Sequence, residues 1–381
     1  MAQGTVAKAK FAEFFSGGGM VHAALGSTWD CVLANDIDAM KCDVYRQNWG
    51  GAHLIEGDVA DLATDTLHRD VDLVWASSPC QDFSLAGKGK GLKGLRSGVF
   101  YHCMRLLSHG VKAGFAPKVI AFENVTGLMS RASGQDFTHV LNSLAALGYR
   151  VGALKIDARH FVPQSRPRLF VIALRNDIEH DGLTLAAPTG IFHTEKLRRY
   201  VNAARADLKS PFTWWAHQPP QLSTMSMADV VDRKPDTSWH SDSKVDALLD
   251  MMSEPSAARI AQARRSGKRE IGLLYKRGRP DETGKIRQRA EARFDGIAGC
   301  SRTPAGGSSR QTIMFVKGNS VKARLLSSKE ASRLMGLPES YQMPAHYNSA
   351  YKVAGGGVVV PIVSYLDEML FQPMLAKARA Q

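Results

Sequence analysis

The chain has 381 residues, of which 44% are hydrophobic and 22% charged, and its formal net charge is +13. This composition excludes a miniprotein, a collagen and a disordered tail, and the length suffices for two domains or for one large domain with an insertion. No uninterrupted apolar run approaches the roughly 18 residues that span a bilayer, so we expect a cytoplasmic protein. The five cysteines include no C-x-x-C pair, so we expect reduced thiols and no metal site.

The positive charge is concentrated in one part of the chain. Residues 259–293 hold twelve basic and four acidic side chains, which is +8 of the total of +13. Proteins rich in Lys and Arg bind polyanions, although some proteins are basic without a specific partner. A basic excess confined to one segment favours a nucleic-acid surface over a general effect on solubility.

The first half of the chain alternates short apolar runs with longer helical patterns. This alternation predicts βαβ units, and therefore an α/β fold with a parallel sheet covered by helices on both faces. In such sheets ligands bind beyond the carboxyl ends of the strands. The predicted strands are Phe11–Phe15, Cys31–Asp36, His53–Glu56, Val71–Ala76, Lys118–Phe122, Arg150–Lys155 and Arg168–Leu174.

The alternation stops near Pro188, and regular structure returns only at Arg324. We expect an inserted, smaller and irregular second domain between these points. Ser327 and Glu330 form an S-x-x-E capping box, which predicts the start of a helix. The predicted organisation is a first domain over 1–188, an inserted domain over 189–344, and a C-terminal segment, 345–381, that returns to the first domain.

A glycine-rich turn follows the first predicted strand. Phe15, Gly17 and Gly19 stand between that strand and a helical pattern, where glycines let the backbone approach a ligand closely. Asp36 ends the second strand and Asp58 follows the third. An acidic residue about 20 positions after the glycines binds ribose hydroxyls in nucleotide-binding folds. For the glycines alone, a tight turn without a ligand is an equal alternative.

Cys80 differs from the other cysteines in its setting. It lies in Pro79-Cys80-Gln81, soon after the apolar strand Val71–Ala76, where a thiol can face a cleft and act as a thiolate nucleophile. The alternative is a small buried hydrophobe, which is our interpretation of Cys31, Cys42 and Cys103. The segment after Cys80 is rich in glycine and lysine. It is either a mobile loop that closes over a phosphate backbone or a disordered connector.

Further charged residues stand at the ends of later strands. Glu123 follows the strand Lys118–Phe122 and could donate a proton to a substrate held at Cys80, although an isolated Glu in this position is more often a solvated charge. Arg166 and Arg168 share a face if their segment is extended. They bind a phosphate or a base carbonyl if they point into the same cleft, and otherwise form a charged edge.

Taken together and in this order, the residues resemble the motifs of the DNA (cytosine-5)-methyltransferase family. The resemblance covers nearly the whole chain: Phe15-x-Gly17-x-Gly19, Asp36, Asp58, Pro79-Cys80-Gln81, Glu123-Asn124-Val125, Gln164-x-Arg166-x-Arg168, Arg333-Leu334-Met335-Gly336-Leu337-Pro338, and Gly355-Gly356-Gly357 with Pro361. It implies a Rossmann-like sheet that binds S-adenosylmethionine, with an inserted target-recognition domain. It also implies a cytoplasmic, nucleoid-associated monomer that methylates C5 of cytosine in double-stranded DNA without a metal, with a cognate restriction endonuclease as a potential partner.

The resemblance also implies a role for each residue. Cys80 adds to C6 of a cytosine flipped out of the duplex, Glu123 supplies a proton, and Arg166 holds the base carbonyl with Arg168 in support. The implied cofactor-binding residues are Phe15, Gly17, Gly19, Asp36, Asp58, Pro79, Gly356 and Val358. The implied DNA-binding residues are Gln81, Ser84, Lys88, Arg96, Arg302 and Arg310.

One motif departs from the family pattern. The family has Gly-Asn where this chain has Gly355-Gly356, so Gly356 removes an amide side chain close to the expected cofactor pocket. Neutral variation is one interpretation. The other is room for a bulkier sulfonium cofactor, carboxy-S-adenosylmethionine, which would give 5-carboxymethylcytosine.

Two further functions stay open at this point. A tRNA cytosine-5 methyltransferase branch resembles this family closely, but that branch usually carries a short recognition segment. This chain has about 130 residues between Pro188 and Asn319, a length that favours a domain that reads DNA. A catalytically silent DNA-binding module would keep the fold, yet it has no need of both Cys80 and Glu123.

Overall fold

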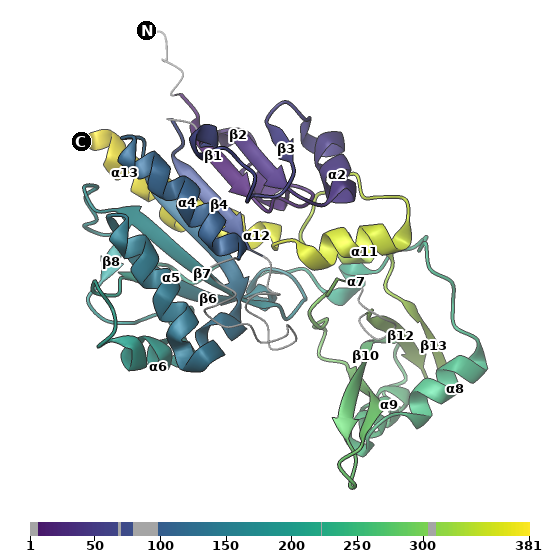
Figure 1. Ribbon diagram of the computed structural model, residues 1–381. Coiled ribbons are helices and arrows are strands. Elements are labelled where there is room, and N and C mark those ends of the chain that lie inside the picture. Colours follow the sequence, from purple (N-terminus) through teal and green to yellow (C-terminus); the bar gives the residue numbers. More distant parts are fainter. Residues whose placement is uncertain (1–6, 68–69, 79–97, 222, 304–309) are drawn as a thin grey trace. The chain divides into compact units, whose positions relative to one another are not determined.

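The computed structural model describes residues 7–67, 70–78, 98–221, 223–303 and 310–381. The chain divides into two compact units (Figure 1). Unit 1 comprises Met1–Asp157, Pro167–Pro220 and Val360–Gln381, and unit 2 comprises Ala158–Arg166 and Gln221–Val359. Six residues with predicted roles lie outside the described residues: Pro79, Cys80, Gln81, Ser84, Lys88 and Arg96.

Unit 1 is built on a seven-stranded sheet in the order β3-β2-β1-β4-β5-β7-β6. Its strands are β1 (Ala9–Phe14), β2 (Trp29–Asp36), β3 (Leu54–Glu56), β4 (Leu73–Ser77), β5 (Val119–Val125), β6 (Tyr149–Asp157) and β7 (Pro167–Arg175). Each predicted strand is found, with its ends shifted by at most three residues. The five neighbouring strands β3, β2, β1, β4 and β5 pair in parallel, so their carboxyl ends meet at one edge of the sheet.

One strand of this sheet departs from the predicted parallel arrangement. β7 is antiparallel to both of its neighbours, β5 and β6. Only residues 158–166 connect β6 to β7, and this segment is shorter than the crossover of about a dozen residues that parallel neighbours require. The prediction of a purely parallel sheet is therefore wrong at β7.

Helices cover both faces of the sheet (Figure 1). On one face, α4 (Val99–Lys112) and α5 (Gln135–Ala146) bury apolar side chains such as Phe100 and Phe137 in a core that includes Val74. Because successive side chains of a strand point to opposite faces, Trp75 lies on the other face, where its ring meets that of Phe371 edge-on at 6.3 Å. Among the described residues of unit 1, the remaining α-helices are α1 (Met20–Leu25), α2 (Ala39–Trp49), α6 (Glu195–Ala204), α12 (Val360–Leu366) and α13 (Gln372–Ala380), the last two joined by a π-helical turn (Asp367–Phe371).

The C-terminal stretch Tyr347–Ala380 is apolar enough to be compared with a membrane span. Its most apolar 18-residue window has a mean hydropathy of 1.4, and 61% of that window is buried inside the structure. The buried core helices of a soluble protein pass the same test of length and composition, so this stretch is only weak support for a membrane span.

Unit 2 contains a four-stranded antiparallel sheet in the order β11-β10-β12-β13. Its strands are β10 (Glu270–Pro280), β11 (Ile286–Arg293), β12 (Thr312–Lys317) and β13 (Ser320–Leu325), and its helices are α7 (Met227–Val230), α8 (Asp242–Asp250), α9 (Glu254–Arg265), α10 (Ser328–Leu334) and α11 (Tyr347–Gly356). The capping box at the start of α10 is present as predicted. The unit is more regular than the sequence suggested. The sequence did not reveal β11 as a strand because the only side chains that it buries are small, Ala290 and Ala292, next to exposed or half-buried arginines.

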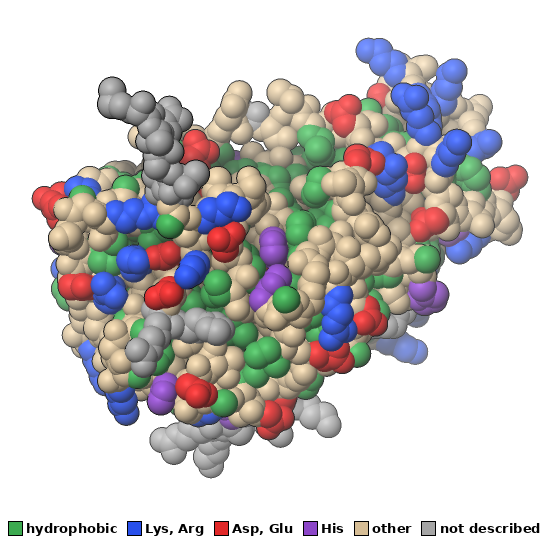
Figure 2. Space-filling model, turned by 90° about the horizontal axis from the view of Figure 1, so that it is seen from above, with side chains coloured by type: hydrophobic (Ala, Val, Ile, Leu, Met, Phe, Trp, Pro, Cys, Tyr) green, Lys and Arg blue, Asp and Glu red, His purple; other side chains and the backbone are tan. Residues whose placement is uncertain are grey.

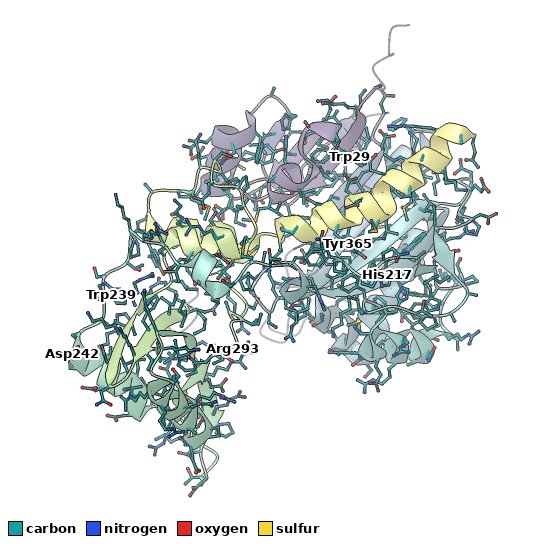
Figure 3. All side chains as sticks on the ribbon, turned by 180° about the vertical axis from the view of Figure 1, so that it is seen from behind. Trp29, His217, Trp239, Asp242, Arg293 and Tyr365 are labelled. Atoms are coloured by element: carbon teal, nitrogen blue, oxygen red, sulfur yellow. The ribbon has the colours of Figure 1, made fainter. Side chains whose placement is uncertain are left out.

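The boundaries of the units differ from the predicted ones. Residues 189–220 belong to unit 1, since the ring of Phe192 stacks on His217 at 5.3 Å and meets Tyr365 of α12 edge-on at 5.6 Å. Figure 3 shows Tyr365 and His217, and the Tyr365 hydroxyl donates a hydrogen bond to the Gln218 carbonyl. The return to unit 1 occurs at Val360, because α11 belongs to unit 2.

Candidate active site

The glycine turn after β1 has a strained backbone. Phe15 has a φ of 60°, a region that side chains other than glycine rarely adopt, and Gly17 and Gly19 have φ values of 57° and 77°. Non-glycine residues with positive φ cost free energy and cluster at functional sites. At Gly19 an added Cβ would lie 2.4 Å from Nε1 of Trp49, so both the backbone conformation and the close packing require glycine there.

Asp36 at the end of β2 is joined to this turn. One carboxylate oxygen accepts a hydrogen bond from the Gly17 amide at 2.8 Å, and the other accepts one from the Asp38 amide at 2.8 Å. Each oxygen keeps a further lone pair that can accept from a ligand hydroxyl. The structure therefore brings together Gly17 and Asp36, as the sequence predicted. Asp58 is half-buried and accepts a hydrogen bond from the Ala60 amide at 2.9 Å.

Two residues beside the turn were missed by the sequence analysis. Ile37 directly follows Asp36 and is 66% exposed, which places an apolar surface next to the carboxylate. The Ser16 hydroxyl is buried and has no hydrogen-bond partner among the described residues. A buried polar atom without a partner is costly, and a bound ligand would satisfy it. Since exposure and hydrogen-bond satisfaction are properties of the folded chain, only the position of Ile37 after Asp36 offered a signal.

Gly356 and Val358, the other predicted cofactor residues, belong to unit 2. Gly356 is exposed at the last position of α11, whereas Val358 is buried. Their approach to the glycine turn stays a prediction.

Glu123 and Arg168 form a mostly buried ion pair at the carboxyl end of β5. Arg168 Nε lies 3.0 Å from Glu123 Oε1, and the two side chains are only 14% and 11% exposed. The register of the sheet causes this contact, since β7 is antiparallel to β5 and sets Arg168 beside Val125. On its other side β5 sets Glu123 beside Ser77, at the end of β4. The carboxylate therefore lies at the sheet edge where β4 leads into Pro79-Cys80.

Arg166 has a different environment within unit 2. Its Nη1 donates to the Ser301 carbonyl at 2.6 Å, and its Nη2 donates to the carbonyls of Gly355 and Gly357 at 3.1 and 2.8 Å. The side chain is only 3% exposed. These contacts give Arg166 a structural task, which is to hold the glycine segment at the end of α11. They do not support the predicted contact with a base carbonyl.

Asn124 is a further residue whose role the sequence did not reveal. Its Nδ2 donates to Ser78 Oγ at 2.9 Å, and its Oδ1 accepts from the Val125 amide at 2.8 Å. Ser78 is the last described residue before the predicted nucleophile. Asn124 therefore ties the end of β5 to the start of the Pro79-Cys80 segment.

We expect Asn124→Ala to lower kcat about tenfold and to leave the affinity for S-adenosylmethionine within about twofold of the parent value. Losing a neutral hydrogen bond costs up to about 1.5 kcal/mol, and about 1.4 kcal/mol corresponds to a tenfold change in rate when the bond positions a reacting group. Single-turnover kinetics and calorimetric titration of the cofactor measure the two quantities. Asn142→Ala, in α5, is the control, since this asparagine bonds the backbone of Asp207 and Lys209 rather than Ser78. Equal losses in cofactor affinity and kcat would contradict a positioning role at Ser78.

Four arginines line one face of the hairpin formed by β10 and β11, and we call this the arginine face. Arg277 lies directly opposite Arg289, and Arg279 lies opposite Arg287. Like charges in directly opposed positions destabilise a sheet. Glu291 offsets part of this repulsion, with carboxylate oxygens 2.7 Å from Arg279 and 3.5 Å from Arg277, whereas Arg289 has no ion-pair partner among the described residues.

A groove of about 830 Å³ adjoins the arginine face. It runs between α9 and the hairpin, and Arg259, Arg279 and Arg293 are among its lining residues. Figure 2 shows Lys and Arg side chains gathered over unit 2, and Figure 3 shows Arg293 in this unit. The basic segment found in the sequence thus becomes a defined surface that is complementary to a polyanion.

The two arginines predicted to contact DNA in unit 2 flank residues 304–309, which lie outside the described residues. Arg302 is exposed. Arg310 donates a hydrogen bond to Asn348 Oδ1 and lies 5.7 Å from the centroid of the Tyr347 ring. Arg302 is therefore accessible to a ligand, while Arg310 is held against α11.

Comparisons with known proteins agree with this geometry. A family model for the C-5 cytosine-specific DNA methylase matches residues 9–372. The chain is 27% identical to the type II methyltransferase M.HhaI of Haemophilus parahaemolyticus, over 94% of this chain and 92% of that protein. It is 25% identical to the type II methyltransferase M.NlaX of Neisseria lactamica, over 95% and 96%. Its fold resembles that of the Dnmt2 methyltransferase of S. pombe, with a TM-score of 0.60 and 18% identity over 97% of this chain and 99% of that one.

Proposed function

This chain belongs to the C-5 cytosine-specific DNA methylase family and is a DNA (cytosine-5)-methyltransferase, and we propose that it acts through a covalent bond between Cys80 Sγ and C6 of a flipped-out cytosine. The observation that carries this proposal is the buried Glu123–Arg168 pair at the edge where β4 leads into Pro79-Cys80. A nucleophile and a carboxyl group at one edge of the sheet are the two groups that the reaction needs.

The chemistry of cytosine explains why both groups are needed. C5 is too weak a nucleophile to accept an alkyl group unaided. Addition of the Cys80 thiolate to C6 breaks the 5,6 double bond and moves its electrons toward C5. Glu123, in its protonated form, contacts N3 and the exocyclic amine and gives its proton to N3, which neutralises the negative charge that reaches the ring. After alkylation, loss of the C5 proton restores the double bond and expels Cys80.

The residues around the glycine turn fit S-adenosylmethionine. Asp36 would accept hydrogen bonds from the ribose hydroxyls, Ile37 would cover the adenine, and the buried Ser16 hydroxyl would gain a partner. When bound, the cofactor supplies a methyl group on a positively charged sulfur. Phe15 would contribute an apolar surface to the cofactor. Its positive φ turns the backbone away from the direction of β1.

The arginines are assigned from their contacts. Arg168 holds the Glu123 carboxylate in position and is the arginine that approaches the base, whereas Arg166 braces residues 355–357. This reverses the roles inferred from the motif, in which Arg166 held the base carbonyl and Arg168 gave support.

We further propose that the arginine face and its groove bind the DNA backbone. The double variant Arg277→Gln/Arg289→Gln should then weaken binding of duplex DNA and lower the slope of log K against log[salt] by up to about 1.8, because each phosphate contact contributes about 0.9. Its folding stability should not fall, since the change removes a pair of opposed like charges. Fluorescence anisotropy across a salt series and thermal unfolding measure the two effects.

Lys377→Gln is the matched control for this variant. Lys377 is a surface cation of α13 in unit 1 that lies 3.7 Å from Glu179. Its removal should leave the salt slope unchanged. If the double variant binds DNA with the slope of the parent chain, the arginine face is not the DNA surface.

The alternative to methyl transfer is transfer of a carboxymethyl group from a bulkier cofactor. Gly356 is exposed and lacks the amide side chain of the family pattern, which supports room for carboxy-S-adenosylmethionine. Mass spectrometry of nucleosides from DNA treated with either cofactor separates the two cases. Formation of 5-methylcytosine alone, even with the carboxylated cofactor supplied, rules out carboxymethyl transfer. Gly356→Asn should abolish any carboxymethyl product and retain 5-methylcytosine.

The remaining expectations concern partners. We propose that the protein works as a cytoplasmic, nucleoid-associated monomer, paired with a restriction endonuclease of the same sequence specificity. The type II relatives support this pairing. Parallel labelling of duplex DNA and tRNA tests the RNA alternative, and transfer to tRNA alone would reverse the choice of substrate.

A further inference from the structure

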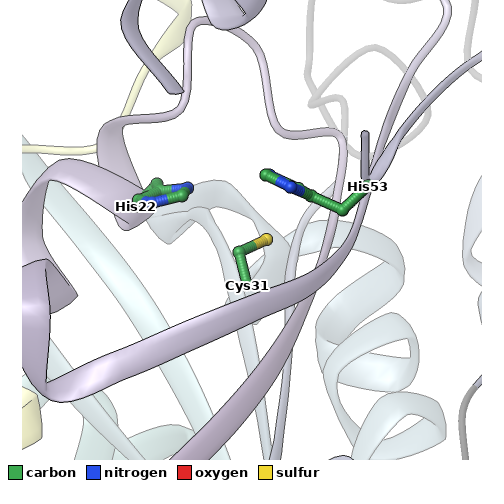
Figure 4. A group of neighbouring side chains, drawn as sticks. All are labelled: His22, Cys31 and His53. Carbon is green, nitrogen blue, oxygen red and sulfur yellow. The ribbon is translucent and has the colours of Figure 1, made fainter. Parts of the chain in front are cut away.

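Three side chains that can ligate a metal converge in unit 1 behind the glycine turn (Figure 4). They are His22 of α1, Cys31 of β2 and His53, which directly precedes β3. Their ligand atoms all lie within 4.8 Å of one another. We propose that these residues bind one zinc ion, with the Tyr45 hydroxyl of α2 as the fourth ligand.

The distances to Tyr45 agree with a tetrahedral site. Its hydroxyl oxygen lies 3.0 Å from His22 Nδ1, 3.0 Å from His53 Nε2 and 3.4 Å from Cys31 Sγ. Zinc binds nitrogen at about 2.0 Å and thiolate sulfur at about 2.3 Å, so ligand atoms at neighbouring corners of a tetrahedron are about 3.3–3.5 Å apart. The three distances to the Tyr45 oxygen lie close to these separations. The ligand atoms of His22, Cys31 and His53 lie within 4.8 Å of one another, so side-chain rotation would have to draw them closer to close the site.

The state of the imidazoles also suits a metal. The neutral imidazole is the form of histidine that binds metals, and both rings are half-buried in this cluster. The Cys31 thiol would release its proton to solvent on binding, and the thiolate so formed would offset one of the two positive charges of the ion.

Glu13 provides an independent sign that a cation would be favourable on this face of the sheet. Its side chain is only 2% exposed, and Oε2 has no hydrogen-bond partner among the described residues. The register of β1 and β2 sets Phe11 beside Cys31 and Glu13 beside Ala34, which puts Glu13 and Cys31 on the same face of the sheet. A zinc ion on this face would offset the cost of burying the carboxylate.

The site would be structural and would support the turn after β1. Trp49 stacks on His22 with ring centroids 4.6 Å apart and an angle of 12° between the planes, and its Nε1 donates to the Gly18 carbonyl at 3.1 Å. An ion that fixes His22 therefore also fixes Trp49, which packs against Gly19. The inference is independent of the covalent mechanism, since it assigns the ion no part in the reaction.

The full-length protein, purified without an affinity tag or a chelator, provides the first test. Elemental analysis should find about one zinc per chain. After removal of the zinc, titration with Co²⁺ should give intense visible bands, which are typical of tetrahedral cobalt, and a near-ultraviolet band from a thiolate bound to cobalt. A zinc-free protein that also fails to develop these bands with Co²⁺ overturns the proposal.

Variants identify the ligands. Cys31→Ser should lose the thiolate band, and His53→Gln should retain it but bind Co²⁺ at least about tenfold more weakly. Cys300→Ser, a cysteine variant in unit 2, is the matched control and should behave as the parent chain does. Far-UV circular dichroism confirms folding, and His53→Gln serves as the decisive variant if Cys31→Ser does not fold. An unchanged cobalt spectrum in Cys31→Ser, or unchanged affinity in His53→Gln, also overturns the assignment. Neither readout depends on methyl transfer, so failure of one proposal leaves the other intact.

Discussion

Replacing Cys80 with serine should lower methyl transfer to duplex DNA by a factor on the order of 10³ or more, while S-adenosylmethionine still binds. The hydroxyl of serine ionises far less readily than a thiol, so the variant lacks the nucleophile that must add to C6. Loss of a group that forms a covalent bond in the reaction has effects of this size or larger. Single-turnover transfer of a labelled methyl group measures the rate, and calorimetry measures cofactor binding.

A covalent trap separates this mechanism from direct transfer. With 5-fluorocytosine at the target position, C5 carries fluorine in place of the proton that must leave, so elimination stops and the protein stays bonded to the DNA. The parent chain and the Cys300→Ser control should give a complex that survives denaturation, and Cys80→Ser should not. A Cys80→Ser protein that methylates DNA as fast as the parent would falsify the covalent mechanism.

Conservative changes at Glu123 and Arg168 should have the second large effect. Glu123→Gln keeps the size of the side chain but cannot exchange a proton, and we expect kcat to fall by about 10²–10⁴-fold, the range for loss of a general acid or base. Arg168→Lys keeps a positive charge beside Glu123 but loses the planar geometry that orients the carboxylate. We therefore expect a smaller fall in kcat, about tenfold, with the thermal unfolding midpoint nearly unchanged.

Arg166→Lys provides the contrast that distinguishes the two arginines. One ammonium group cannot replace guanidinium nitrogens that donate to Ser301, Gly355 and Gly357. Buried carbonyls left without donors cost about 1–3 kcal/mol each, so this variant should lower the unfolding midpoint by more than Arg168→Lys does. The reverse pattern, with Arg166→Lys slow but fully stable, would return the substrate contact to Arg166.

The candidate site shows where sequence reasoning reached its limit. Arg166 and Arg168 are two residues apart and were expected to act together, yet Arg168 lies in unit 1 and Arg166 in unit 2. The antiparallel register of β7 brings Arg168 to Glu123, and no local pattern encodes that register. Asn124 was part of a recognised motif, but its bond to Ser78 joins residues 46 positions apart.

The sequence analysis did not predict the group formed by His22, Cys31 and His53, for a similar reason. The usual zinc signals are short spacings between ligands in one loop, whereas these residues come from α1, β2 and the approach to β3. Cys31 was interpreted as a small buried hydrophobe, and it is in fact half-buried and within 3.4 Å of the Tyr45 hydroxyl. Only the packing of α1 and α2 near β2 and β3 brings the three side chains together.

By itself the sequence determined the family, the order of the motifs and the strands of the first half. These are properties of residue type and of short-range periodicity, which a linear chain displays directly. Only the tertiary structure decided the reversal of β7, the ordered sheet of unit 2, the unit boundaries at Pro220 and Val360, and the separate environments of Arg166 and Arg168. All of these depend on contacts between distant residues, whose energies arise only when strands pair and side chains become buried together.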